Sequence, residues 1–173
     1  LDIFVDVTDP VKFSRLTLVN TGSATRRLSL VAYNDWVLGP PRDDQGTYVT
    51  TRLDKATGAV MATNAYNAER AGRVAFARLS DPLCSATADR GLFIGRNGAL
   101  STPAGMQTMM LPARFGVGLD PCAALHARVE LAPGASHSVV LLLGEGTSEG
   151  HARELIARHG RVVHFDTYGK ANA

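Results

Sequence analysis

This 173-residue chain has few of the residues that build disulfide-rich or membrane-spanning proteins. Its two cysteines, Cys84 and Cys122, lie far apart and form no CxxC motif, which excludes a disulfide framework. We therefore expect two unbridged, buried thiols in a reducing compartment. No segment reaches the roughly 18 consecutive apolar residues that a membrane-spanning helix requires, so direct membrane insertion is not expected.

Charge of one sign is also scarce, because the formal net charge is only +2. Such a balance provides no basic footprint for nucleic acid and little attraction to an anionic membrane. Hydrophobic residues make up 45% of the chain and charged residues 20%, as in ordinary globular domains. Because the chain begins at Leu1, directly in strand-like sequence, we expect a fragment of a longer polypeptide.

Motifs for self-contained catalysis are missing. The five histidines form no HExxH pattern and none has a cysteine at zinc-ligand spacing, so no metal site is predicted. Neither a GxSxG elbow nor a nucleotide-binding glycine pattern is present, which leaves no predicted catalytic residue and no cofactor. His151 and His159 fall on a predicted helix, where we expect both side chains to be solvent-exposed.

The chain does contain a series of strand-like segments separated by turn signals. The turn at 20–23 predicts an antiparallel pair of its flanking strands, and DKATG (54–58) predicts a second hairpin. The apolar run HSVVLLL (137–143) is typical of a central strand covered on both faces. The predicted strands are 15–20, 26–39, 47–53, 59–64, 72–80 and two that flank the PG turn within 127–146. This pattern predicts an all-β sandwich.

One segment, 147–160, is predicted to be a helix. Thr147 or Ser148 can cap its start, Glu149 lies in the first turn near the positive end of the dipole, and Gly160 can end it. The expected organisation is a β-sandwich domain at 1–146, a linker helix at 147–160 and an irregular tail at 161–173.

Two features leave alternatives open. In ADRGLFIGRNGAL (88–100), Arg90 and Arg96 could bind phosphate or vicinal sugar hydroxyls, with glycines that let the backbone approach a ligand. Alternatively, the glycines serve turns with positive φ and the arginines are solvated. Trp36, the only tryptophan, is either a core side chain or a stacking platform for a sugar.

Five segments in order resemble one protein family. They are NDWVLG (34–39), ATNAYNAERAGRVAF (62–76), ADRGLFIGRNGAL (88–100), GVGLDPCAALHARVELAPG (116–134) and LLLGEGTSEGHARELI (141–156). Together they resemble the β-sandwich domain of the cellobiose and chitobiose phosphorylase family, glycoside hydrolase family 94, formerly glycosyltransferase family 36. The similarity is strongest to the phosphorylase-like region of cyclic β-1,2-glucan synthases, and it covers nearly all of residues 1–158.

The resemblance implies a galactose-mutarotase-like β-supersandwich, incomplete at its N-terminal side, followed by a linker helix. In this family an (α/α)6 barrel carries the catalytic aspartate, and inorganic phosphate is the co-substrate. The chain would be the non-catalytic sandwich of a glycosyltransferase or glycoside phosphorylase, and inactive alone. Its implied partners are a β-glucan oligosaccharide, the barrel of the same polypeptide and, where a sheet edge is exposed, a second copy in a homodimer. The implied location is cytoplasmic, with any inner-membrane anchor of the parent enzyme outside this chain.

The family pattern DRxxFxG falls on Asp89, Arg90, Phe93 and Gly95. It implies that Arg90 reaches the sugar and phosphate site, that Asp89 orients its guanidinium, and that Arg96 and Asn97 line the same rim. Two alternatives stay open, an independent carbohydrate-binding module and a purely structural or dimer-forming sandwich.

Overall fold

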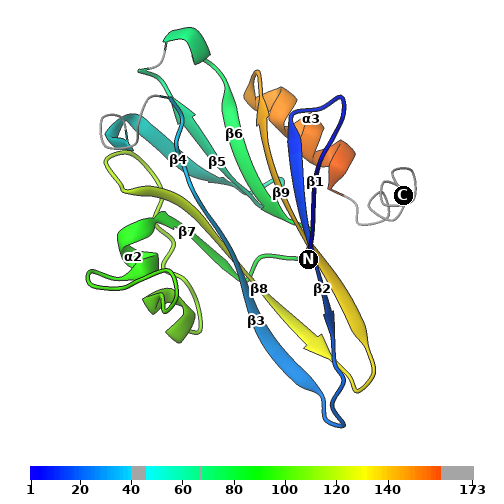
Figure 1. Cartoon of the computed structure of the whole chain (residues 1–173). Coiled ribbons are helices and arrows are strands. Elements are labelled where there is room, and N and C mark those ends of the chain that lie inside the picture. The colour runs from blue at the N-terminus through cyan, green and yellow to red at the C-terminus, as the bar shows by residue number, and fades with distance from the viewer. Residues whose placement is uncertain (40–45, 67, 161–173) are drawn as a thin grey trace.

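The computed structural model describes residues 1–39, 46–66 and 68–160 (Figure 1). Its strands are β1 (Asp2–Val5), β2 (Val11–Val19), β3 (Arg26–Asp35), β4 (Val49–Asp54), β5 (Ala59–Asn64), β6 (Val74–Leu79), β7 (Ser85–Asp89), β8 (Pro121–Leu131) and β9 (Ser136–Gly146). In this part of the chain the helices are α2 (Arg90–Ile94) and α3 (Glu149–His159), with 3-10 turns η1 (Gly46–Tyr48), η2 (Ala68–Arg70) and η3 (Ala104–Gln107).

The described strands form two antiparallel sheets, which confirms the all-β class. One sheet has the order β1-β2-β9-β6-β5-β4 and the other the order β3-β8-β7. The main core lies between them, and the β6 alternation decides which side chains enter it. Ala75 and Ala77 belong to this core, whereas Val74 and Phe76 belong to the opposite face of the six-stranded sheet.

Helix α3 covers that opposite face, on the side away from β3, β7 and β8 (Figure 1). Its start follows from Ser148, whose side chain accepts a hydrogen bond from the backbone N–H of His151. Ala152, Leu155 and Ile156, at helical spacing, are buried against the sheet. The predicted central strand is confirmed, because β9 lies between β2 and β6 and is covered on both faces.

Helix α2 forms a smaller layer on the outer face of the three-stranded sheet. Phe93 and Ile94 are buried there with Leu111 and Ala124, and the Tyr33 and Phe93 rings stack with centroids 5.0 Å apart. Sequence analysis identified no helix here, because five residues are too few to show helical periodicity. Gly95 ends α2 with φ of 91°, as expected for a glycine-dependent turn, while Gly98 does not have a positive φ.

The hairpin predicted across the turn at 20–23 is wrong. β2 pairs with β9, and β3 pairs with β8 in the other sheet. The PG turn likewise joins β8 to β9 across the two sheets. A turn sequence allows the chain to reverse, but it does not determine whether the next strand pairs with its neighbour or packs across the core. The β4–β5 hairpin is confirmed.

His159 also differs from its prediction. It was expected to be exposed, but it is buried and its Nε2 lies 2.6 Å from Asp9 Oδ2. The last turn of α3 faces the loop between β1 and β2, so the position of the helix on the sheet determines this contact. Both cysteines are unbridged, and Cys122 is buried whereas Cys84 is half-buried. The predicted tail at 161–173 lies outside the described residues.

Candidate functional site

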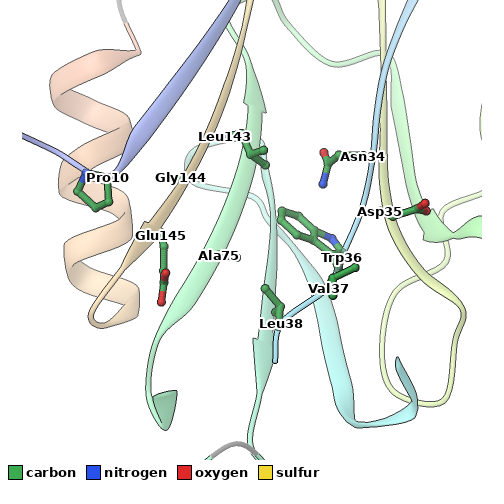
Figure 2. A pocket seen from close by; sticks show the side chains of 10 residues that line it. All are labelled: Pro10, Asn34, Asp35, Trp36, Val37, Leu38, Ala75, Leu143, Gly144 and Glu145. Carbon is green, nitrogen blue, oxygen red and sulfur yellow. The ribbon is translucent and has the colours of Figure 1, made fainter. Parts of the chain in front are cut away.

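Two groups of polar side chains lie at the end of β3. Successive strand side chains point to opposite faces, so this end divides its residues in two. Tyr33 and Asp35 face α2, whereas Asn34 and Trp36 face the six-stranded sheet. Figure 2 shows this division, with Asp35 pointing away from the side on which Asn34 and Trp36 lie.

On the α2 side, Arg90 joins two carboxylates. Its Nη1 donates to Asp120 Oδ2 at 3.3 Å, and its Nε lies 3.7 Å from Asp35 Oδ1. The backbone N–H of Arg90 also donates to the carbonyl of Asp120 at 2.9 Å. The hydrogen bond that Arg90 donates to Asp120 raises the pKa of Arg90, so the guanidinium is charged at every physiological pH.

Tyr33 completes this arrangement by donating its hydroxyl hydrogen bond to Asp35. Burial, followed by the Asp35 hydrogen bond, raises the pKa of Tyr33, and the phenol therefore acts as a donor. The four residues, Tyr33, Asp35, Arg90 and Asp120, are called the Arg90 cluster below. The Arg90 side chain keeps 40% of its surface exposed, so part of the guanidinium can contact a ligand.

The other predicted site residues occupy different positions. Asp89 caps α2 by accepting from the backbone N–H of Leu92 at 3.3 Å, and its Oδ2 lies 3.8 Å from Arg114 Nε. It therefore positions the helix that carries Arg90, while Asp35 and Asp120 contact the guanidinium itself. Arg96 and Asn97 follow Gly95 with exposed side chains and do not contribute to the Arg90 cluster.

Sequence reasoning missed Asp120 and Asp35 as partners of Arg90. The strand register explains why they meet it, since Asp35 pairs with Cys122 and Asp89 pairs with Pro121. Asp120 immediately precedes β8 and so lies between the ends of β3 and β7. The only signal for Asp120 in the sequence was its position directly before a central strand. The pairing of β8 with β3 and β7 is what brings it beside Arg90.

On the other side of β3 lies a pocket of about 360 Å³ between the two sheets. Asn34, Trp36 and Leu38 line it from the β3 end, facing residues of β6 and β9 such as Ala75 and Leu143 (Figure 2). Trp36 is only 4% exposed and belongs to the main core, as one of its two interpretations predicted. Its Nε1 and both amide atoms of Asn34 are buried with no hydrogen-bond partner among the described residues.

A third polar group lies at the end of α3. Ligand atoms of Asp6, Asp9 and His159 lie within 4.8 Å of one another, which is close enough for a shared metal ion. However, Asp9 Oδ2 also accepts from Arg158 Nη1 at 2.8 Å, and that positive charge opposes a cation. The hydrogen bond from His159 lowers the pKa of Asp9, and we interpret the group as an anchor for the helix.

These sites lie in a chain whose family is shown by comparison. Residues 1–162 match the supersandwich domain of glycosyl hydrolase family 94, and the chain belongs to this family. The cyclic β-(1,2)-glucan synthase NdvB of Rhizobium meliloti (strain 1021) is 31% identical over 163 residues. That match covers 94% of this chain but 6% of the relative, so the chain corresponds to a small part of that protein.

The fold is also found in a solved polysaccharide lyase. The structural match has a TM-score of 0.51 at 12% identity, and it covers 89% of this chain and 21% of the lyase. At this identity the match supports the sandwich fold alone. The resemblance noted from the sequence motifs is thus confirmed as a family membership. Among the described residues, no helix has the length and apolar character to cross a membrane.

Proposed function

We propose that this chain is the non-catalytic sandwich of a glycoside phosphorylase or cyclic β-1,2-glucan synthase, and that it supports an (α/α)6 catalytic barrel. In this proposal Arg90 extends from the sandwich to the sugar site at the barrel mouth. The family membership supports the first part. The arrangement of Arg90, charged, half-exposed and held between two carboxylates, supports the second.

The local charge favours a sugar over phosphate as the group that Arg90 contacts. Two carboxylates lie within 3.7 Å of one guanidinium, so the Arg90 cluster carries a net negative charge. A free phosphate would be repelled by Asp35 and Asp120, whereas neutral hydroxyls can donate to them and accept from Arg90. Inorganic phosphate would then be a co-substrate bound mainly by the barrel. We expect the domain to function in the cytoplasm, which agrees with its unbridged cysteines.

Phosphorolysis by the enzyme that contains this domain tests the role of Arg90. Arg90→Ala should reduce kcat/KM at least about tenfold, because a charged hydrogen bond to substrate is worth roughly 1.5–3 kcal/mol. Arg27→Ala is a matched control, since Arg27 is an exposed arginine paired with Glu130 at the other end of β3. Unchanged kinetics in Arg90→Ala, with an unchanged melting temperature, would contradict a substrate contact.

A structural, self-associating sandwich is the second candidate function. The edge strand β1 supports it, because Ile3 and Val5 are 58% and 64% exposed there and Val7 just beyond is 90% exposed. An exposed apolar edge of this kind favours pairing with a second copy. Light scattering at increasing protein concentration should show a dimer that Val5→Lys disrupts, and a monomer at all concentrations would contradict self-association.

A further inference from the structure

The pocket beside Trp36 holds polar atoms that the fold itself does not use. The indole Nε1 of Trp36 and the Oδ1 and Nδ2 of Asn34 are buried without a hydrogen-bond partner in the described chain. Most buried polar groups in native proteins are hydrogen-bonded, and each unsatisfied one disfavours folding. All three atoms belong to residues that line one pocket, where they lie just beneath its surface, and their unmet hydrogen bonds point to a hydrogen-bonding guest.

The surroundings show that these polar atoms are not required for packing. Leu38, Ala75 and Leu143 line the same pocket with apolar surface (Figure 2). A leucine in place of Asn34 would continue this apolar lining and would bury no amide. The tryptophan contributes apolar area to the core, and its N–H is the only part of the ring that needs a polar partner.

The donor and acceptor set indicates what kind of guest fits. Asn34 provides one acceptor and one donor group in a single plane, and Trp36 provides a further donor. Hydroxyl groups, which both donate and accept, can satisfy all three atoms. A cavity of about 360 Å³ lies within the size range of small-molecule sites.

The charge around the pocket favours a neutral guest. Glu145 lies at its edge, but its carboxylate is paired with Arg70 at 3.5 Å and Arg73 at 3.2 Å. Asp35 also borders the pocket, yet its side chain points to the opposite face of β3 (Figure 2). Among the described residues that line the pocket, neither a cation nor a carboxylate is therefore directed inward to select an ion.

We propose that Asn34 and Trp36 form a second carbohydrate site, which binds one neutral hexosyl unit between the two sheets, independently of Arg90. This site would lie on the opposite face of β3 from the Arg90 cluster and would hold glucan at a distance from the reaction. The choice of a glucose-based ligand rests on the proposed carbohydrate function. Binding at the pocket does not require any contact by Arg90.

Because Trp36 is the only tryptophan, its indole N–H resonance and its fluorescence report on this pocket alone. The first experiment titrates the chain with a β-1,2-linked glucose disaccharide to about 50 mM, a range that detects millimolar affinity. The indole N–H signal should shift saturably. Inorganic phosphate at the same concentration should leave it unchanged. No shift with the sugar, or contacts of the N–H only with long-lived water, would overturn the proposal.

Two variants separate a ligand site from a structural role. Asn34→Leu should weaken sugar binding at least about tenfold while its melting temperature stays equal or rises, since it removes two buried unpaired atoms. Trp36→Phe, followed by calorimetry, should weaken binding while preserving the fold. Wild-type affinity in both, or a lower melting temperature in Asn34→Leu, would overturn the proposal.

Arg90→Ala distinguishes this inference from the proposed function. If the pocket is an independent site, the indole shift persists with unchanged affinity in Arg90→Ala. Loss of the shift in that variant would overturn the independence of the two sites. Reduced phosphorolysis in Arg90→Ala, with no sugar shift at Trp36, would support the proposed function and reject the pocket.

Discussion

The two faces at the end of β3 differ in whether their polar side chains have hydrogen-bond partners. On the α2 face, Tyr33 and Asp35 join Arg90 in a network of hydrogen bonds and ion pairs. On the face toward the six-stranded sheet, Asn34 and Trp36 bury polar atoms that have no partner among the described residues. Four consecutive residues thus face two different environments, because strand side chains alternate: Tyr33 and Asp35 are hydrogen-bonded to each other, whereas the polar atoms of Asn34 and Trp36 are not paired within the described chain.

This difference separates stability from binding. The ion pairs of the Arg90 cluster are partly exposed, and such pairs contribute only about 0–1 kcal/mol. The indole of Trp36 contributes much more through burial, while its unpaired N–H reduces that benefit. The core face therefore contributes more to the stability of the domain than the α2 face does.

The largest expected effect comes from the core face. Trp36→Ala should destabilise the domain by about 3–5 kcal/mol, the usual cost of removing a large aromatic side chain from a core. Urea denaturation followed by circular dichroism measures this change, and Trp36→Phe should lose less because it retains most of the apolar volume. A loss below about 1 kcal/mol would show that Trp36 is not a core residue in solution.

A more deeply buried ion pair sharpens the comparison with the Arg90 cluster. Asp54, with 4% side-chain exposure, accepts two hydrogen bonds from Arg153 of α3 at 2.8 and 3.2 Å. Asp54→Asn should cost about 1–3 kcal/mol in free energy of unfolding, because Arg153 then faces a neutral amide. The same denaturation assay measures this cost. A cost as small as that of Arg90→Ala would show that burial does not make the Asp54–Arg153 pair more stabilising than the ion pairs of the Arg90 cluster.

The pH dependence of this pair has a defined sign. The Arg153 hydrogen bond lowers the pKa of Asp54 from 3.8 to about 2. A lowered folded-state pKa adds stability that is fully present above 3.8 and is lost as pH falls through about 2. Denaturant midpoints measured between neutral and acidic pH should fall more steeply for the wild type than for Asp54→Asn, and parallel curves would contradict the linkage.

On the α2 face, Tyr33→Phe should have a moderate effect. It removes the hydrogen bond to Asp35 at a cost of about 0.5–1.5 kcal/mol, while the ring stacking on Phe93 is retained. Burial raises the pKa of Tyr33 above its ordinary 10.0, so its contribution is complete below pH 10.0 and declines as pH rises further. Stability curves at alkaline pH should be flatter for Tyr33→Phe, and identical curves would contradict this.

The smallest expected effect on stability is that of Arg90→Ala. The guanidinium is 40% exposed, and its removal should change the free energy of unfolding by less than about 1 kcal/mol. Asp35 and Asp120 would remain solvated, so the fold should persist. A loss above about 2 kcal/mol, measured by urea denaturation, would show that Arg90 is mainly a structural residue.

Much of the fold could be predicted from local patterns. The β4–β5 hairpin, the central strand β9 and helix α3 agree with the sequence analysis, because alternation, turn residues and capping act over a few residues. The hairpin across 20–23 was wrong, since β2 and β3 enter different sheets. The choice between pairing and packing depends on apolar surfaces that are distant in sequence.

The candidate site shows the same limit. The family motif singled out Arg90, and the strand interpretation of Trp36 as a core residue is confirmed. Asp120 was not identified as the partner of Arg90, because thirty residues of chain, including α2 and η3, separate the two. The role of Asp89 as a helix cap was also missed, since α2 itself was not predicted.

The sequence by itself determined the family, the all-β class and the alternation that sends Tyr33 with Asp35 to one face of β3 and Asn34 with Trp36 to the other. Only the tertiary structure decided which groups those faces meet: Asp120 beside Arg90 and an apolar pocket beside Trp36. Side-chain direction is a local property of the backbone, with a period of two residues. Which residues a side chain contacts depends on sheet pairing and core packing, because these bring together residues that are far apart in the chain.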